Sequence, residues 1–182
     1  MARILLILGV TGAGKSTIIN KILSYDQRFC YVKPYTDRIR EKDSEKNYVT
    51  TEDINILIEN NSQVIVNEMY GFTYVTLIED IKQLMYNGYF PVLDFPIQYI
   101  DKLRQIFPNI VYSVYILPPN IITLKKRLHL DRKKRITSAL QEIKDFHDGK
   151  FEQSDMVIVN HNGKKYPKRI ANTIYRNFLN VT

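Results

Sequence analysis

The sequence predicts a doubly wound α/β domain with a mostly parallel central sheet. Short apolar runs alternate with amphipathic stretches along the whole chain. The runs are rich in β-branched and aromatic residues and nearly continuous, as in strands that are buried on both faces of a parallel sheet. A chain of 182 residues, 45% of them hydrophobic, suffices for one domain with a sizeable core. We therefore expect a single domain over residues 1–182.

Apolar runs and amphipathic stretches mark the expected elements in order. The predicted strands are Ile4–Leu8, Val64–Val66, Phe90–Leu93, Ile110–Leu117 and Met156–Val159. Helices are predicted where apolar residues recur at helical spacing. These stretches are Ile18–Leu23, Val75–Met85, Ile121–Leu128, Ile136–Phe146 and Pro167–Leu179. The stretch from Pro34 to Glu59 breaks the alternation, because it is highly charged and has few apolar residues before Ile54, and we expect a small polar lobe there.

Composition limits the classes of partner and compartment. The 26 Lys+Arg residues exceed the 19 Asp+Glu residues, and the resulting charge of +7 favours a polyanionic partner: nucleic acid, an acidic membrane surface or a phosphate-rich small molecule. The single cysteine, Cys30, excludes an intrachain disulfide and fits a reducing compartment. No run approaches the roughly 18 apolar residues of a membrane span. We therefore expect a cytoplasmic protein without membrane association.

The strongest motif is a phosphate-binding loop at Gly9–Ser16. It fits G-x-x-x-x-G-K-[ST] directly after the first predicted strand and before a helix. Glycines let successive backbone N–H groups face a phosphate, while Lys15 reaches the β- and γ-phosphates and Ser16 offers its hydroxyl to Mg²⁺. The predicted ATP-binding residues are Gly9, Thr11, Gly12, Ala13, Gly14, Lys15, Ser16 and Thr17.

A phosphate-binding loop of this kind requires a carboxylate for the magnesium ion or its water ligand. Asp94 closes the predicted strand Phe90–Leu93, which places a carboxylate at the end of a strand expected beside the first. The predicted metal ligands are therefore Ser16 and Asp94, and the alternative for Asp94 is a surface aspartate that caps a strand end.

Segments along nearly the whole chain resemble the guanylate kinases and guanylate-kinase-like domains. Gly9–Thr17 is similar to the family's GxxGxGKST, Tyr35–Arg40 to its T-T-R-x-x-R element and Tyr48–Thr50 to the F-V-S that follows. Leu93–Asp94 resembles the start of L-D-I-D, and Ile116–Pro119 resembles I-L-P-P. Ser154–Asn160 is similar to Y-D-Y-V-I-V-N, and residues 127–128 and 135–143 resemble the helices that flank the family's lid.

The resemblance implies a nucleoside monophosphate kinase with ATP as donor, Mg²⁺ as cofactor and a GMP-like acceptor under the polar lobe. That lobe then spans approximately residues 34–75 and binds the acceptor. Arg38 matches the arginine that holds the acceptor phosphate, and Arg40 stands for the second arginine of the same motif, displaced by one residue. The residues expected at the acceptor are Arg38, Arg40, Asn67, Glu68, Tyr74 and Asp94.

Departures from the family pattern gather at the acceptor base. Ile65 aligns with the guanine-reading glutamate, Val75 lies near a guanine-contacting serine or threonine, and Pro96 aligns with the second aspartate of L-D-I-D. A shift in register would let Asn67 or Glu68 read the base instead. The sequence therefore does not decide which purine or pyrimidine monophosphate is the acceptor, and deoxy and modified monophosphates are included among the alternatives.

A basic segment precedes the predicted helix Ile136–Phe146. Seven cations fall between residues 125 and 135, offset by Asp131, and we interpret residues 125–138 as a short lid. Arg127, Arg132 and Arg135 would close over the phosphates and join Lys15 and Arg38 as catalytic residues; the alternative is a solvated helical face. Because this segment carries most of the net charge, small phosphates explain that charge better than nucleic acid does.

Two further hypotheses remain open beside the nucleoside monophosphate kinase. One is a kinase that acts on a non-standard phosphorylated acceptor or on a nucleic-acid end, which the altered acceptor positions favour. The other is a non-catalytic guanylate-kinase-like module that binds a partner, although such a module has no need for Lys15 and Ser16. We expect a monomer or homodimer.

Overall fold

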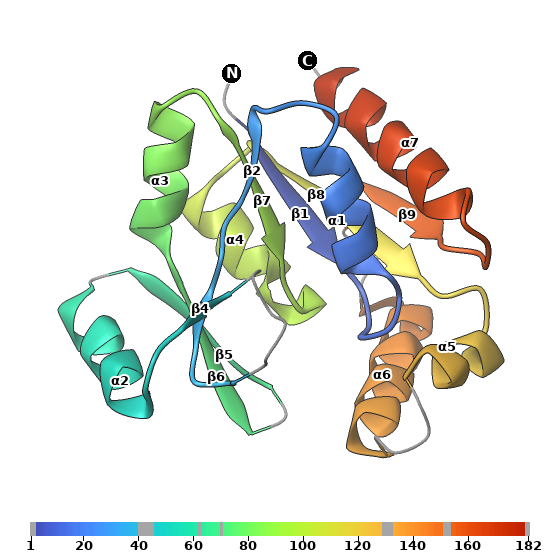
Figure 1. Ribbon diagram of the computed structural model, residues 1–182, viewed down its shortest axis with the longest axis horizontal. Coiled ribbons are helices and arrows are strands. Elements are labelled where there is room, and N and C mark those ends of the chain that lie inside the picture. The colour runs from blue at the N-terminus through green and yellow to red at the C-terminus, as the bar shows by residue number, and fades with distance from the viewer. Residues whose placement is uncertain are drawn as a thin grey trace.

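The computed structural model describes residues 3–39, 46–61, 63–69, 71–128, 133–150 and 154–180. A central twisted sheet lies between two layers of helices, and a smaller sheet with its own helix lies to one side (Figure 1). The predicted α/β fold is confirmed, since every neighbouring pair of strands in the central sheet is parallel.

The central sheet has the strand order β2-β7-β1-β8-β9. Its strands are β1 (Ile4–Leu8), β2 (Phe29–Tyr31), β7 (Phe90–Asp94), β8 (Val111–Leu117) and β9 (Met156–Val159). β1 at the centre is buried along its whole length, as its unbroken apolar sequence predicts. Ile7 of β1 pairs with Asp94 of β7, so the end of β1 brings the loop that follows it beside Asp94.

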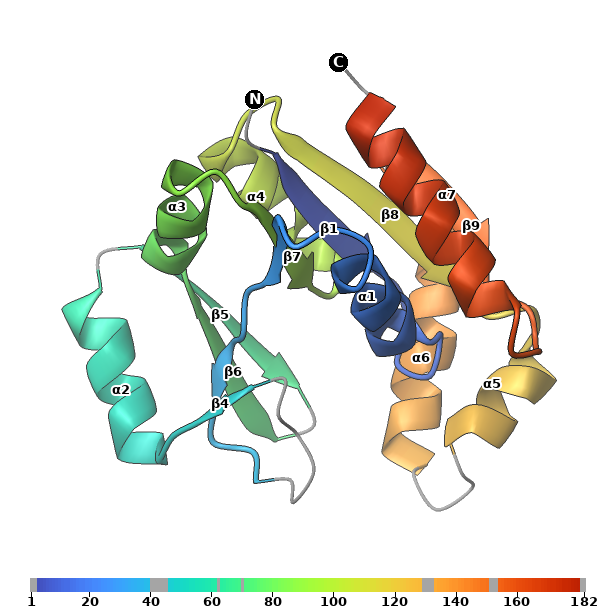
Figure 2. The same cartoon turned by 45° about the horizontal axis from the view of Figure 1, so that its top comes forward.

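Helices cover both faces of the central sheet because β1 presents apolar side chains on both. Leu5 and Ile7 pack in the core formed with α1 (Lys15–Leu23) and α7 (Tyr166–Asn180), which lie side by side on one face (Figure 2). Ile4, Leu6 and Leu8 pack in the core on the other face, with α3 and α4. The remaining helices are α3 (Ile78–Tyr86), η1 (Ile97–Tyr99), α4 (Ile100–Ile106), α5 (Ile121–Leu128), α6 (Lys133–Asp145) and η2 (Phe146–Lys150).

The smaller sheet has the strand order β4-β3-β6-β5 and includes antiparallel pairs. Its strands are β3 (Tyr35–Thr36), β4 (Asn47–Tyr48), β5 (Val64–Met69) and β6 (Phe72–Leu77). α2 (Thr51–Asn60) begins with a capping box, in which the Asp53 amide donates to Thr50 Oγ1 at 3.1 Å and the Thr50 amide donates to Asp53 Oδ2 at 3.1 Å. Ile54 of α2 packs on Val75 and Leu77, so the helix covers one face of this sheet.

Two predicted elements differ from the structure. Val64–Val66 is a strand, but it belongs to the smaller sheet and pairs antiparallel with β6 rather than entering the central sheet. Val75–Leu77 was expected at the start of a helix, yet it ends β6, and the helix begins at Ile78. Val75 and Thr76 are β-branched, and in a paired hairpin their strand preference prevails over the helical spacing of the apolar residues that follow.

Candidate functional site

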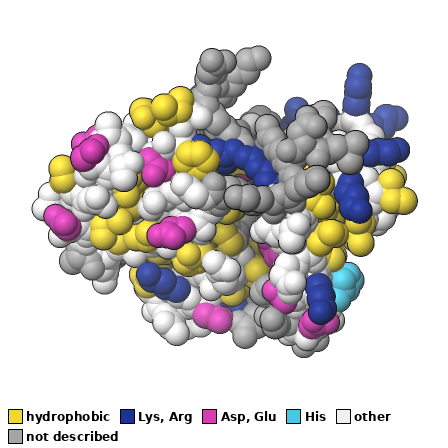
Figure 3. Space-filling view, turned by 90° about the horizontal axis from the view of Figure 1, so that it is seen from below, with side chains coloured by type: hydrophobic (Ala, Val, Ile, Leu, Met, Phe, Trp, Pro, Cys, Tyr) yellow, Lys and Arg dark blue, Asp and Glu magenta, His cyan; other side chains and the backbone are white. Residues whose placement is uncertain are grey.

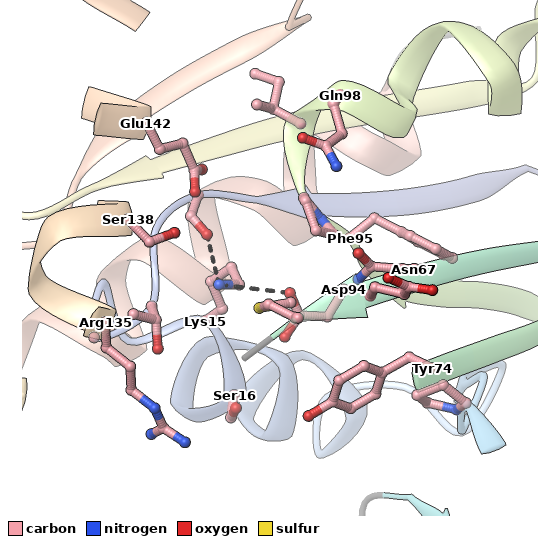
Figure 4. A pocket seen from close by; sticks show the side chains of 18 of the residues that line it. Lys15, Ser16, Asn67, Tyr74, Asp94, Phe95, Gln98, Arg135, Ser138 and Glu142 are labelled. Atoms are coloured by element: carbon pink, nitrogen blue, oxygen red, sulfur yellow. Dashed lines mark hydrogen bonds and ion pairs between the residues drawn. The ribbon is translucent and has the colours of Figure 1, made fainter. Parts of the chain in front are cut away.

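A cavity of about 650 Å³ opens at the carboxyl ends of β1 and β7, between the smaller sheet and α6. One end is formed by the loop between β1 and α1, the other by the β5–β6 hairpin and the residues around β3. Figure 4 shows Arg135, Ser138 and Glu142 of α6 on one side, Asn67 and Tyr74 of the hairpin on the other, and Lys15 and Asp94 between them. Ligands of parallel sheets bind at such carboxyl ends.

The loop from Gly9 to Gly14 joins β1 to α1 in the conformation that a phosphate site requires. Gly9 and Gly14 have φ values of 130° and 97°, where an L side chain is strained. A Cβ on Gly9 would overlap the carbonyl oxygen of Ile116, and a Cβ on Gly14 would overlap Nδ2 of Asn160. The loop is therefore held against β8 and Asn160 at the two positions where the motif has glycine.

Lys15 begins α1 and points into the cavity. Its Nζ donates to the carbonyl oxygen of Gly9 at 2.6 Å and lies 3.6 Å from Oδ1 of Asp94 (Figure 4). Both side chains are largely buried, with 14% of Lys15 and 25% of Asp94 exposed. The structure thus brings together the two residues that the motif and the end of β7 predicted as partners at the phosphates.

The donor set beside Lys15 fits a magnesium ion. Ser16 follows Lys15 in the first turn of α1, and both Ser16 and Asp94 line the cavity. A hydroxyl and a carboxylate are hard oxygen ligands, and Mg²⁺ takes one or two such protein ligands together with phosphate oxygens and water. Within the described residues there is no group of three or more His, Cys, Asp or Glu that would hold a metal alone. The residues therefore fit an ion that arrives with a nucleotide.

Most of the remaining predicted ATP-binding residues line the same cavity: Gly9, Thr11, Gly12, Gly14, Ser16 and Thr17. Ala13 does not, because its methyl group is buried in the core. Its carbonyl oxygen instead accepts a hydrogen bond of 2.7 Å from Nδ2 of Asn160, at the end of β9. Oδ1 of Asn160 is buried and has no partner among the described atoms.

The structure does not bring Arg127 into the cavity. Its guanidinium donates to the carbonyl oxygens of Ala13 at 3.3 Å and Asn160 at 3.0 Å, and to Oδ1 of Asn162 at 3.0 Å. Arg127 lies in the last turn of α5 and ties that helix to the back of the phosphate-binding loop. Of the other arginines predicted in the lid, Arg135 lines the cavity, and Arg132 lies outside the described residues.

The acceptor end carries two cations around one tyrosine. Arg38 donates from a guanidinium nitrogen to the hydroxyl of Tyr74 at 3.0 Å, and Nζ of Lys46 lies 4.5 Å from the centre of the Tyr74 ring. Asp37 accepts from the amide of Thr73 at 2.9 Å and so fastens the segment of Arg38 to β6. The predicted residues Arg38 and Tyr74 are therefore together, whereas Arg40 lies outside the described part of the chain.

Strand alternation decides which hairpin residues face the cavity. Ile65 and Val75 are fully buried in separate apolar cores, so neither aligned position can read a base. Asn67 and Thr76 line the cavity and are 6% and 4% exposed. Glu68 also lines the cavity but is exposed. The sequence did not indicate Thr76 as a cavity residue, because the register of the β5–β6 hairpin, rather than the family alignment, determines which residues of β6 face the cavity.

Glu142 on α6 is a further cavity residue that the sequence indicated only as part of a family-like helix. Its Oε1 accepts a hydrogen bond of 3.2 Å from the hydroxyl of Tyr115, which is fully buried in β8 and stacks on Phe146. Burial raises the pKa of the Glu142 carboxyl, while the charge of Lys15 and the Tyr115 hydrogen bond act in the opposite direction. This contact joins α6 to the central sheet.

The charge of the cavity differs from that of the whole chain. Many of the Lys and Arg side chains seen from below lie on the side of α5 and α7 (Figure 3). The described charged residues that line the cavity balance, with Lys15, Arg38, Lys46 and Arg135 against Glu68, Asp94, Glu142 and Asp145. The described site therefore presents equal numbers of positive and negative side chains and not a broad positive surface.

Comparison with known proteins gives a consistent result. A family model described as guanylate kinase matches residues 1–176. The guanylate kinase of Malacoplasma penetrans is 27% identical, covering 97% of this chain and 94% of the relative. The guanylate kinase of Clostridium acetobutylicum is 31% identical over 69% of this chain and 61% of the relative.

Solved structures agree on the fold. The guanylate kinase of Anaplasma phagocytophilum superposes with a TM-score of 0.73 at 21% identity, covering 99% of this chain and 87% of its own. The shikimate kinase of Acinetobacter baumannii in complex with shikimate has a TM-score of 0.54 at 11% identity, covering 100% of this chain and 97% of its own. Within the described residues, no helix combines the length and apolar character that crossing a membrane requires.

Proposed function

The chain belongs to the guanylate kinase family, whose members are ATP-dependent nucleoside monophosphate kinases, and we propose that this member transfers the γ-phosphoryl group of ATP to GMP or a closely similar monophosphate. The observation that carries the proposal is the placement of Lys15 and Arg38 around one cavity. A phosphate-binding loop and an acceptor arginine at the same cavity suit transfer between two bound nucleotides.

The donor phosphates bind where the first turn of α1 meets the loop. Backbone N–H groups and the positive end of the helix dipole attract them, and Lys15 leaves the Gly9 carbonyl to contact the β- and γ-phosphates. Ser16 and Asp94 would hold Mg²⁺ through their oxygen atoms, and the ion would supply charge neutralisation at the phosphates. Asp94 also holds Lys15 in the cavity before the nucleotide arrives.

The acceptor phosphate binds to Arg38, which Tyr74 orients by a hydrogen bond, and Lys46 adds a second positive charge beside it. Arg135 of α6 lines the cavity, which supports a role for this arginine at the transferring group. Arg127 has a different role in this proposal, because its bonds to the Ala13 and Asn160 carbonyls direct its guanidinium to the loop backbone.

The other two hypotheses that the sequence left open receive no support from the relatives, which are named guanylate kinases. A direct assay tests the proposed function: ADP formation from ATP is followed with GMP, dGMP, AMP, UMP and dTMP as acceptors. We expect turnover with GMP. Binding of ATP without turnover of any monophosphate would contradict the proposal.

Replacing Arg38 by alanine is expected to raise KM for GMP by about a hundredfold while changing KM for ATP by less than about threefold. The variant loses charge-assisted hydrogen bonds to the acceptor phosphate and leaves the donor end intact. Steady-state kinetics with each substrate varied in turn measures the two constants. Arg169→Ala is the matched control, since Arg169 is an exposed arginine on α7. Equal changes in the two KM values would place Arg38 outside the acceptor site.

A further inference from the structure

Two uncharged polar side chains are buried at the acceptor end without a partner. Asn67 and Thr76 are 6% and 4% exposed, and neither side chain makes a hydrogen bond to any described residue. The polar atoms of both side chains remain open to the cavity, because neither is among the described atoms that are sealed from solvent without a partner. A ligand that covers this wall therefore has to supply matching polar atoms, since an amide or hydroxyl covered without a hydrogen bond costs free energy. Figure 4 shows Asn67 near Asp94 and Phe95 in the cavity.

The pairing of residues in the β5–β6 hairpin places these two side chains relative to Arg38, which we propose binds the acceptor phosphate. Asn67 pairs directly with Tyr74, whose hydroxyl holds Arg38, and Thr76 pairs with Ile65, two residues further along the strands. Two residues of strand span about 7 Å, and all four side chains share the face that is turned away from α2. A monophosphate held by Arg38 therefore has its base in reach of Asn67 and Thr76.

An amide side chain binds a different set of hydrogen-bonding groups on a base than a carboxylate does. A carboxylate only accepts hydrogen bonds, whereas the side chain of Asn67 has an oxygen that accepts and a nitrogen that donates. The edge of a 6-oxopurine offers a keto oxygen and, beside it, a ring N–H. Asn67 satisfies both, and Thr76 adds a hydroxyl that can donate to the keto oxygen. Neither side chain supplies an anionic acceptor for a 2-amino group.

The carboxylates around the cavity lie elsewhere. Asp94 is engaged with Lys15, while Glu142 and Asp145 stand on α6 at the donor side. Glu68 follows Asn67 in β5, so strand alternation puts it on the opposite face with Val66, but Glu68 is exposed and also lines the cavity. Glu68 is the competitor that the experiment has to separate from Asn67.

We propose that the acceptor site takes 6-oxopurine nucleoside monophosphates with or without a 2-amino group, because Asn67 reads the keto oxygen and the ring N–H. This inference rests on the proposed function. The 2-amino group then contributes at most a neutral hydrogen bond, which is worth about tenfold or less. A buried carboxylate reader, left with no amino group to bind, would discriminate about a hundredfold or more.

The test compares kcat/KM for GMP and IMP, the same nucleotide without the 2-amino group. The wild-type protein is expected to use the two within about tenfold of each other, and Asn67→Asp, an isosteric change, is expected to raise the ratio of GMP to IMP by about tenfold or more. A wild-type preference for GMP above a hundredfold, or an unchanged ratio in Asn67→Asp, would overturn the inference. Turnover of neither nucleotide would overturn the proposed function instead.

The variant Glu68→Gln tests whether Glu68, rather than Asn67, binds the base. If Asn67 reads the base, this variant keeps the wild-type ratio of GMP to IMP; a fall of the ratio by tenfold or more would assign the reading to Glu68 and overturn the inference. Direct titration of GMP and IMP into each variant gives the same ratios as binding constants, and thermal unfolding confirms that each variant is folded. These readouts keep the conclusion independent of the rate of phosphoryl transfer.

Discussion

Replacing Lys15 by alanine will lower kcat for phosphoryl transfer by about a thousandfold, because one preorganised cation at the site of developing charge supplies a stabilisation of that order. The Nζ of Lys15 is the cation that the structure holds closest to the phosphate-binding loop, between the Gly9 carbonyl and Asp94. The other described cations that line the cavity, Arg38, Lys46 and Arg135, lie on other elements of the fold.

Lys21→Ala is the matched control for Lys15→Ala. Lys21 lies on the same helix, is exposed and is remote from the cavity-lining residues, so its removal should leave kcat unchanged within about twofold. Initial rates at saturating ATP and GMP give kcat, and circular dichroism confirms the fold of both variants. A Lys15→Ala enzyme that retains more than a tenth of wild-type kcat would refute the assigned role.

Replacing Gly9 by alanine will lower the free energy of unfolding by about 3 kcal/mol, which corresponds to a fall in Tm of roughly 10 °C for a chain of this length. Two effects add. Gly9 has a φ of 130°, which a residue with a Cβ adopts only under strain, and the new methyl group would overlap the Ile116 carbonyl. That carbonyl belongs to the backbone of β8, where Ile116 pairs with Ile158 of β9, and it cannot move without disturbing this pairing.

Gly88→Ala separates strain from overlap. Gly88 has a φ of 80° but no atom within 4 Å of the position of a Cβ, so only the conformational cost remains, about 1 kcal/mol. Denaturant unfolding of both variants measures the two changes in free energy. If Gly9→Ala were no less stable than Gly88→Ala, the close approach of the loop to β8 would contribute nothing to the fold.

The donor half of the site was predictable from sequence because its chemistry is local. The loop, Lys15 and Ser16 are fixed by one contiguous motif, and Asp94 follows from its position at the end of an apolar strand. The central sheet was predictable for a related reason, since strands buried on both faces are apolar throughout.

The acceptor half depends on pairing between distant segments, which a pattern in one segment does not encode. β3 and β4 have two residues each and are held by partners elsewhere in the chain. A change of one position in the hairpin register would turn Val66 and Glu68 towards the cavity in place of Ile65 and Asn67, and only the pairing of β5 with β6 decides between the two sets. The charge run likewise could not show that Arg127 turns back to the Ala13 and Asn160 carbonyls.

The hydrogen bond from Asn160 to the Ala13 carbonyl joins residues 147 positions apart. During synthesis the side chain that holds the phosphate-binding loop is therefore added 147 residues after the carbonyl that it binds. Arg127 bonds to the same carbonyl, from a position 114 residues after Ala13. The loop therefore receives its hydrogen bonds from Arg127 and Asn160 only after these later segments have been synthesised. A nascent chain gains a finished donor site only after β9 has joined the sheet.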